Sequence, residues 1–196
     1  MLLDRDGVLN EIVVHPELGT VDSPLHPDQV QIPRGIPEAL RDLTQAGYLL
    51  SIVTNQPAAA KGKTTLENLK KTHERVLEEI QSAGGKILSS HLCLHRQEDQ
   101  CACRKPKTLL LEEALGRSQA ERSVSWMIGD GVTDIQAGAA LGLKTAFLGP
   151  RKCDACKVME TRGLVPTFWG KNLTDFVSFL LKRKSYEHQH QDQHQN

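Results

Sequence analysis

The chain has 196 residues, with 24 Lys and Arg against 24 Asp and Glu, so its formal net charge is zero. This length is typical of one domain whose core is large enough to need no disulfides. The zero charge argues against nucleic-acid binding through many phosphate contacts, and no apolar run approaches the ~20 residues of a membrane span.

The N-terminus carries Asp4 and Asp6 where a secretion signal would need a basic start and an apolar core. We therefore expect a cytoplasmic protein, in a compartment that disfavours disulfides. The chain has five cysteines, and clustered cysteines in such a compartment favour metal binding over pairing with each other.

Short apolar runs alternate with amphipathic stretches along the chain. Each apolar run ends in turn residues, as buried parallel strands do. We expect strands at 48–53, 87–92, 125–128 and 144–148. We expect helices at 37–45, 65–83, 108–115, 134–141 and 173–184. This alternation predicts an α/β fold with a parallel sheet.

The two ends of the chain differ from the middle. Only three residues precede the first acidic motif, so either the given sequence begins late or the first strand is short. The segment 186–196 is polar and low in complexity, and we expect it to be disordered. Residues 1–185 then form a single domain.

Four polar motifs each fall at the carboxyl end of an expected strand, where open α/β sheets carry their chemistry. They are Asp4-Arg5-Asp6-Gly7, Thr54-Asn55, Arg104-Lys105, and Gly129-Asp130 with Asp134. Carboxylates hold Mg²⁺, while a hydroxyl and an ammonium bind phosphoryl oxygens. Each motif alone is equally well a turn, but all four in this order predict phosphoryl chemistry.

The two acids of the first motif have different expected roles. If Asp4 attacks phosphorus, Asp6 lies two residues further along and is free to act on the leaving group. Attack by a carboxylate on phosphorus gives an aspartyl-phosphate, which is a form of covalent catalysis.

This set of motifs resembles the haloacid dehalogenase superfamily of phosphatases over residues 4–148. The resemblance implies a Rossmann-like parallel sheet flanked by helices. It implies that Asp4 is the nucleophile and a Mg²⁺ ligand. It also implies that Asp6 is the general acid and base, with its backbone carbonyl on Mg²⁺.

The resemblance assigns the remaining motifs to the phosphoryl group and the metal. It implies that Thr54 and Lys105 bind the phosphoryl group and that Asn55 supports them. Asp130 would be a Mg²⁺ ligand, and Asp134 would orient the metal site. The gaps between the motifs leave no room for a separate cap domain, so the chain resembles the capless members with an open site.

A cysteine and histidine cluster lies just before Lys105. Its members are Cys93, His95, Cys101 and Cys103. Three thiolates and an imidazole make a complete tetrahedral set for structural Zn²⁺, with no open position for a catalytic water. The alternative is a set of surface thiols. If zinc binds, it fixes the loop that delivers the phosphate-binding lysine.

The cluster and the residues after it resemble two related groups within the superfamily. One is the D-glycero-D-manno-heptose 1,7-bisphosphate 7-phosphatases of heptose biosynthesis, and the other is the histidinol-phosphatases. The stretch Ala60-Lys61-Gly62-Lys63-Thr64 is similar to the heptose group, while the short spacing from His95 to Cys101 is similar to the histidinol group. We favour the heptose group.

A bisphosphate substrate needs cations for its second phosphate. Arg104 is the stronger candidate, since a guanidinium forks onto phosphate. Lys61 and Lys63 are further candidates, or they are simply solvated at the start of a helix. Cys153 and Cys156 are expected to be free surface thiols, with a redox pair or an intermolecular zinc site as alternatives.

The sequence therefore predicts a Mg²⁺-dependent phosphomonoesterase that acts on a small sugar phosphate, as a monomer and without nucleic-acid or membrane partners. The alternative enzyme is a histidinol-phosphate phosphatase or another small-molecule phosphatase. The alternative from another class is a phosphate- or zinc-binding module without turnover. The second acid, Asp6, argues against that module because binding alone does not need it.

Overall fold

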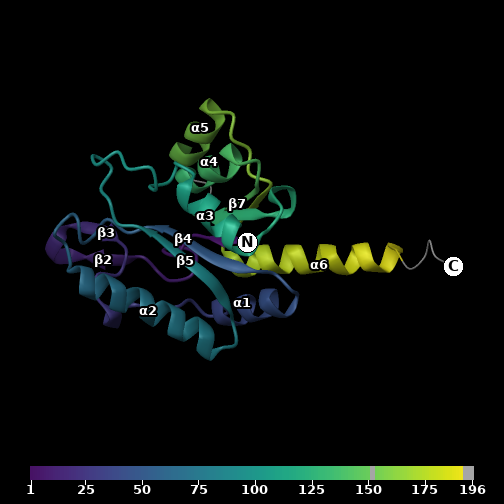
Figure 1. Cartoon of the computed structure of the whole chain (residues 1–196), viewed down its shortest axis with the longest axis horizontal. Coiled ribbons are helices and arrows are strands. Elements are labelled where there is room, and N and C mark those ends of the chain that lie inside the picture. The colour runs from purple at the N-terminus through teal and green to yellow at the C-terminus, as the bar shows by residue number, and fades with distance from the viewer. Residues whose placement is uncertain (151–152, 192–196) are drawn as a thin grey trace.

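The computed structural model describes residues 1–150 and 153–191, and a parallel sheet forms its centre (Figure 1). The sheet has six strands in the order β5-β4-β1-β6-β7-β8. Their bounds are β5 Ile87–Cys93, β4 Leu50–Asn55, β1 Leu2–Leu3, β6 Trp126–Gly129, β7 Lys144–Leu148 and β8 Phe168–Gly170. Every neighbouring pair is parallel. The predicted fold class is confirmed.

Helices cover both faces of this sheet. They are α1 Ile36–Gln45, α2 Leu66–Ser82, α3 Leu109–Ser118, α4 Val132–Ala140, α5 Cys153–Thr161 and α6 Leu173–Gln191. Helices α1, α2 and α6 share one core cluster, whereas α3 and α4 share another. Figure 1 shows α1 and α2 on one side of the strands and α3, α4 and α5 on the other.

The strand residues divide between these two cores by simple alternation. Leu3 and Ile52 belong to the core under α1, α2 and α6, while their neighbours Leu2 and Val53 belong to the core under α3 and α4. Side chains along a strand point alternately to opposite faces, so a strand buried on both faces must be apolar throughout. This explains why the predicted runs were continuous rather than alternating.

Strand β1 is two residues long, yet it lies in the middle of the sheet. It pairs with β4 on one side and with β6 on the other. The N-terminal ammonium of Met1 also donates to the Leu49 carbonyl at 2.6 Å. Asp4 therefore follows directly after the most central strand, at the carboxyl end where the other motifs also lie.

Several elements were not expected from the sequence. A small antiparallel hairpin, β2 Val13–His15 and β3 Thr20–Asp22, follows the first acidic motif. Strand β8 and helix α5 were also missed. Short 3-10 turns occupy Pro16–Leu18, Pro27–Gln29 and Arg122–Val124. Apart from the nine-residue α5, each of these elements has only three residues, and residue periodicity is informative only over longer windows.

Helix α6 corrects one prediction at the C-terminus. The helix continues to Gln191, so residues 186–191 are helical where a disordered tail was predicted. Extending an established helix costs little, because only the first turn is unfavourable to form. Residues 192–196 lie outside the described part of the chain, and the single domain over 1–185 stays a prediction.

Two further predictions concern the second cysteine pair and the membrane. Cys156 is a free, partly buried thiol in α5. The side chain of Cys153 and residues 151–152 lie outside what the structure describes. Among the described helices, none is long and apolar enough to cross a membrane.

The anchoring of α6 can be tested at Phe176. This side chain is fully buried, and its ring lies edge-on to Trp126 and Phe168 with centroids 5.0 and 5.4 Å away. We expect Phe176→Ala to lower the free energy of unfolding by about 3–5 kcal/mol in urea titrations. Phe179→Ala, at a 37% exposed position on the same helix, is the control and should cost much less. Equal losses would contradict this packing.

Candidate active site

Lys105 joins three of the four motifs at the carboxyl edge of the sheet. Its Nζ lies 3.0 Å from Asp4 Oδ1 and 2.6 Å from Asp134 Oδ1. It also donates to the Val53 carbonyl at 2.7 Å. Burial alone would lower the pKa of Lys105, but the two carboxylates outweigh it and the net shift is upward. The side chain is therefore a fixed, buried cation.

Asn55 holds the backbone of that lysine in place. Its Oδ1 accepts from the Lys105 amide at 3.0 Å, and its Nδ2 donates to the Lys105 carbonyl at 3.2 Å. Thr54 precedes it at the end of β4, and its hydroxyl accepts a hydrogen bond from Gln56 Nε2 at 3.0 Å. In the second motif, the Thr54 hydroxyl therefore faces the site, while the Asn55 amide holds the backbone of Lys105.

The carboxylates of Asp4, Asp130 and Asp134 form an acidic cluster, with one oxygen of each within 4.8 Å of the others. Burial, and then the charges of Asp4 and Asp134, raise the pKa of Asp130 to about 7. Burial chiefly raises the pKa of Asp134 to about 6, although Lys105 opposes the shift. Three crowded carboxylates are relieved by a cation, and an all-oxygen donor set suits Mg²⁺.

Gly7 leaves the space that Asp130 occupies. A Cβ atom at position 7 would lie 2.2 Å from Asp130 Oδ2, and the residue has φ +77°, a left-handed conformation that favours glycine. The glycine of the first motif is thus explained by the close approach of the fourth motif.

The motif residues line one cavity of about 270 Å³. The predicted residues in its wall are Asp4, Asp6, Thr54, Asn55, Lys105 and Asp130. Sequence reasoning missed its other lining residues, which are Ile12, Val21, Asp22, Ser23 and Thr133. Most of these belong to the β2–β3 hairpin or lie beside it, so the hairpin forms one wall of the cavity.

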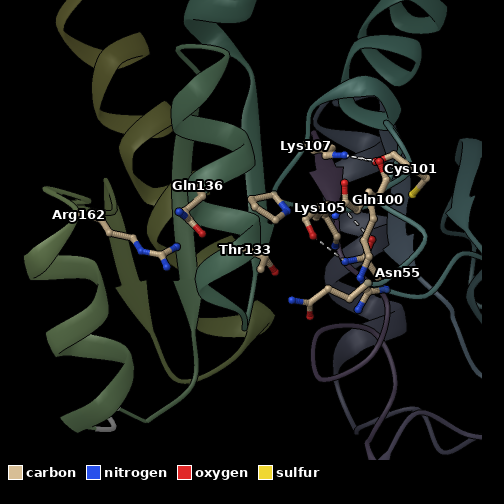
Figure 2. Close-up of a pocket in the computed structure, with 11 residues that line it drawn as sticks. Asn55, Gln100, Cys101, Lys105, Lys107, Thr133, Gln136 and Arg162 are labelled. Carbon is tan, nitrogen blue, oxygen red and sulfur yellow. Dashed lines mark hydrogen bonds between the residues drawn. The ribbon is translucent and has the colours of Figure 1, made fainter.

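A second cavity of about 430 Å³ adjoins the first and shares Asn55, Lys105 and Thr133 with it. Figure 2 shows Arg162 and Gln136 on one side of it and Lys105 and Lys107 on the other. Arg104 lines this second cavity and not the first. Its Nη1 donates to the His95 carbonyl at 3.3 Å.

The two other candidate substrate cations lie elsewhere. Lys63 Nζ lies 2.6 Å from Asp22 Oδ2. Burial raises the pKa of Asp22, but Lys63 outweighs it and the net shift is downward, so the charge of Lys63 is already paired. Lys61 is exposed. Neither lysine is among the residues that line the two cavities.

The predicted zinc ligands converge. The Cys93 Sγ atom lies 3.6 Å from Cys101 Sγ and 3.2 Å from Cys103 Sγ, and His95 Nδ1 lies 3.3 Å from Cys103 Sγ. Burial and the neighbouring sulfurs raise the pKa of Cys103 to about 12. Three thiolates this close together need a cation, and the set suits Zn²⁺.

Comparison with known proteins decides the family. Residues 102–175 match a family model described as HAD-hydrolase-like. The D-glycero-beta-D-manno-heptose-1,7-bisphosphate 7-phosphatase of Neisseria meningitidis is 35% identical over 148 residues, which are 76% of this chain and 75% of that protein. The chain belongs to the haloacid dehalogenase superfamily of phosphatases. The predicted family and enzyme class are confirmed.

Two further similar proteins represent the two groups within the superfamily that the sequence resembles. The histidine biosynthesis bifunctional protein HisB of Legionella pneumophila is 35% identical over 143 residues, which are 73% of this chain but 39% of that protein. The D,D-heptose 1,7-bisphosphate phosphatase of B. bronchiseptica, solved with magnesium and phosphate, has a TM-score of 0.77 at 26% identity. That match covers 93% of this phosphatase and 98% of its structural neighbour.

The acidic cluster predicts cation binding that depends on pH. With a pKa of about 7, Asp130 is mostly protonated in mild acid and must lose its proton before a cation binds. We expect Mg²⁺ to raise the melting temperature more at about pH 8 than at about pH 5.5, because proton and metal compete for these oxygens. Asp130→Asn should remove most of this shift. A magnesium effect independent of pH would contradict the cluster.

Proposed function

We propose that this phosphatase removes the 7-phosphate of D-glycero-D-manno-heptose 1,7-bisphosphate in a Mg²⁺-dependent reaction. The observation that carries the proposal is the buried Lys105 ammonium between Asp4 and Asp134, at the floor of the first cavity. The similarity to heptose bisphosphate phosphatases, of which one was solved with magnesium and phosphate, supports the substrate and the metal.

In the proposed reaction, a carboxylate oxygen of Asp4 attacks phosphorus and the bond from phosphorus to the sugar oxygen breaks. Asp6 gives its proton to the departing alkoxide. Asp6 then takes a proton from the water that hydrolyses the aspartyl-phosphate, which restores both acids. Lys105 and the Thr54 hydroxyl bind phosphoryl oxygens as their charge grows. Bound Mg²⁺ supplies further charge neutralisation to those oxygens.

The second cavity favours a bisphosphate over histidinol phosphate. Four of its lining residues are cations, namely Lys105, which it shares with the first cavity, and Arg104, Lys107 and Arg162; none of its lining residues is a carboxylate. Among the described residues, the Lys107 ammonium donates to the backbone carbonyls of Gln100 and Cys101, which carry no charge. A second phosphate is attracted to these charges, whereas the amine of histidinol phosphate is repelled.

The substrate assignment is tested by phosphate release from the heptose bisphosphate and from histidinol phosphate in parallel. We expect the heptose bisphosphate to be preferred and to keep its anomeric phosphate. Asp4→Asn should abolish release, because an amide cannot form the aspartyl-phosphate, while the melting temperature stays near that of the wild type. Preference for histidinol phosphate would transfer the proposal to that substrate, and turnover by Asp4→Asn would exclude the mechanism.

We further propose that the four-ligand cluster binds one structural Zn²⁺ that positions Lys105. Cys93 is the last residue of β5 and Cys103 lies two residues before the lysine, so the ion would tie the lysine loop to the sheet. The set has four protein ligands and leaves no position for a reacting water.

This zinc proposal predicts a difference between two cysteine variants. Cys103→Ser should lose the metal and lower kcat by about 10²-fold, since misplacing a substrate-binding group by about 1 Å has effects of that size. Cys156→Ser, at the free thiol of α5, should keep both metal and activity. Elemental analysis of the purified protein gives the metal content. Full activity in a zinc-free Cys103→Ser variant would contradict the positioning role.

A further inference from the structure

Arg5, the residue between the two acids of the first motif, lies beneath the site with its side chain fully buried. Its Nε and Nη2 donate to Asp6 Oδ1 at 3.1 and 2.9 Å, and Nη2 also lies 3.1 Å from Asp6 Oδ2. The planar guanidinium thus contacts both oxygens of the carboxyl group, a geometry that fixes orientation as well as distance.

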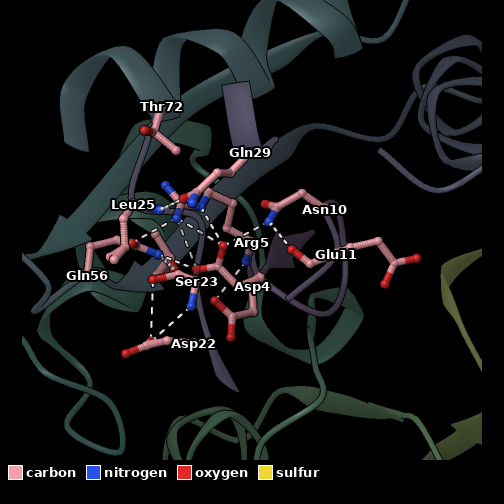
Figure 3. A network of polar contacts seen from close by, with 12 residues as sticks. Asp4, Arg5, Asn10, Glu11, Asp22, Ser23, Leu25, Gln29, Gln56 and Thr72 are labelled. Atoms are coloured by element: carbon pink, nitrogen blue, oxygen red, sulfur yellow. Dashed lines mark hydrogen bonds and ion pairs between the residues drawn. The ribbon is translucent and has the colours of Figure 1, made fainter. Parts of the chain in front are cut away.

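Gln56 closes this contact into a ring. Its Oε1 accepts from Arg5 Nη2 at 2.8 Å, and its Nε2 donates to Asp6 Oδ2. Figure 3 shows Arg5 and Gln56 side by side, although 51 positions separate them in the sequence. Asn10 Nδ2 adds a further hydrogen bond to Asp6 Oδ1 at 2.9 Å. We call Arg5 and Gln56 together the Arg5–Gln56 clamp.

The clamp leaves Asp6 one open direction. The Asp6 side chain is 15% exposed, and the residue lines the first cavity. The contacts from Arg5, Gln56 and Asn10 occupy its other sides, so the accessible part faces the place where a phosphoryl group binds. A group that transfers a proton must lie within hydrogen-bond reach of the reacting oxygen, which makes this orientation important.

The burial of Arg5 has no other evident function. Burying a guanidinium costs several kcal/mol unless its partners compensate. Arg5 forms an ion pair with Asp6, and its Nη1 has no hydrogen-bond partner among the described residues. The nearby His73 is uncharged at neutral pH, because burial and then Arg5 itself lower the pKa of His73 to about 4, so it does not compensate the guanidinium charge. The cation is thus held for its contact with Asp6.

We propose that Arg5 and Gln56 are positioning residues that aim the Asp6 carboxyl at the leaving-group oxygen. The inference rests on the proposed function, because it needs Asp6 to protonate that oxygen. In the step it serves, the bond from phosphorus to the ester oxygen breaks and the Asp6 proton moves to that oxygen. The clamp transfers no proton and contacts no phosphoryl group.

A leaving-group comparison isolates this role. An alkoxide leaves poorly without a proton, whereas a nitrophenolate leaves readily as the anion, so only the alkyl ester depends strongly on Asp6. The ratio kcat/KM excludes the later hydrolysis of the aspartyl-phosphate, because it reports steps through the first irreversible one. The experiment therefore measures kcat/KM for ethyl phosphate and for 4-nitrophenyl phosphate.

We expect Arg5→Met to lower kcat/KM about 10²-fold for ethyl phosphate, in the range of general acid catalysis, and less than about fivefold for 4-nitrophenyl phosphate. Arg5→Lys keeps the charge and should regain part of the lost rate. Asp6→Asn is the reference and should show the same selective loss. Arg41→Met is the matched control, since Arg41 also pairs with the next residue, Asp42, but on helix α1. It should change neither rate.

Other results would contradict either the positioning role of Arg5 or the proposed function. Equal losses on the two esters would show that Arg5 is merely structural, and no loss would show that Asp6 is aimed without it. If Arg5→Met fails to fold, Arg5→Lys and Gln56→Met decide by the same ratio. If the wild-type protein releases phosphate neither from the heptose bisphosphate nor from the two esters, the proposed function fails and the inference falls with it. If the wild type hydrolyses both, only the inference is at stake.

Discussion

The arrangement of this phosphatase depends on one buried ammonium, that of Lys105, held between Asp4 and Asp134. A buried cation is tolerated only when carboxylates and carbonyl oxygens surround it. Those partners lie directly after β1, in β4 and at the start of α4, so the lysine has its stable position only in the assembled sheet. The fold and the site therefore depend on the same charges, because Asp4 and Asp134, which compensate the Lys105 ammonium, also belong to the acidic cluster at the candidate metal position.

The lysine reaches this position from a loop, which makes the anchoring of the loop the second constraint. Between β5 and α3 the chain has no helix or strand of its own. Asn55 holds the Lys105 backbone through two hydrogen bonds. The four-ligand cluster, which begins at Cys93 in β5, would anchor the same loop if it binds the proposed Zn²⁺. A loop that is held at two places keeps the Lys105 ammonium in one position. A free loop of this length would sample many conformations, and the ammonium would then be poorly positioned.

The residues that the sequence predicted and those that it missed differ in a physical way. Asp4, Thr54 and Asp130 were predictable because each directly follows a strand, and parallel strands bring their carboxyl ends to one edge. Lys105 lies in a loop and was predicted from its place in the order of the motifs. The Arg5–Gln56 clamp and the pairing of Lys63 with Asp22 were missed, since these contacts join positions 51 and 41 residues apart and leave no local pattern. The extension of α6 was missed because the composition of residues 186–191 suggests disorder, whereas the helix continues through them.

The two adjoining cavities differ in charge, and this difference orients a bisphosphate. The first is lined by four carboxylates, those of Asp4, Asp6, Asp22 and Asp130, and by one lysine, so an approaching phosphate meets net negative charge unless a metal offsets it. The second presents Arg104, Lys107 and Arg162 with no lining carboxylate, so it attracts phosphate without a metal. In the proposed reaction, the phosphate that stays on the sugar would bind to these fixed protein cations. Mg²⁺ held by the carboxylates of Asp4 and Asp130 would neutralise the charge that repels the reacting phosphate. Binding energy from the non-reacting end then holds the reacting end against carboxylates that would otherwise repel it.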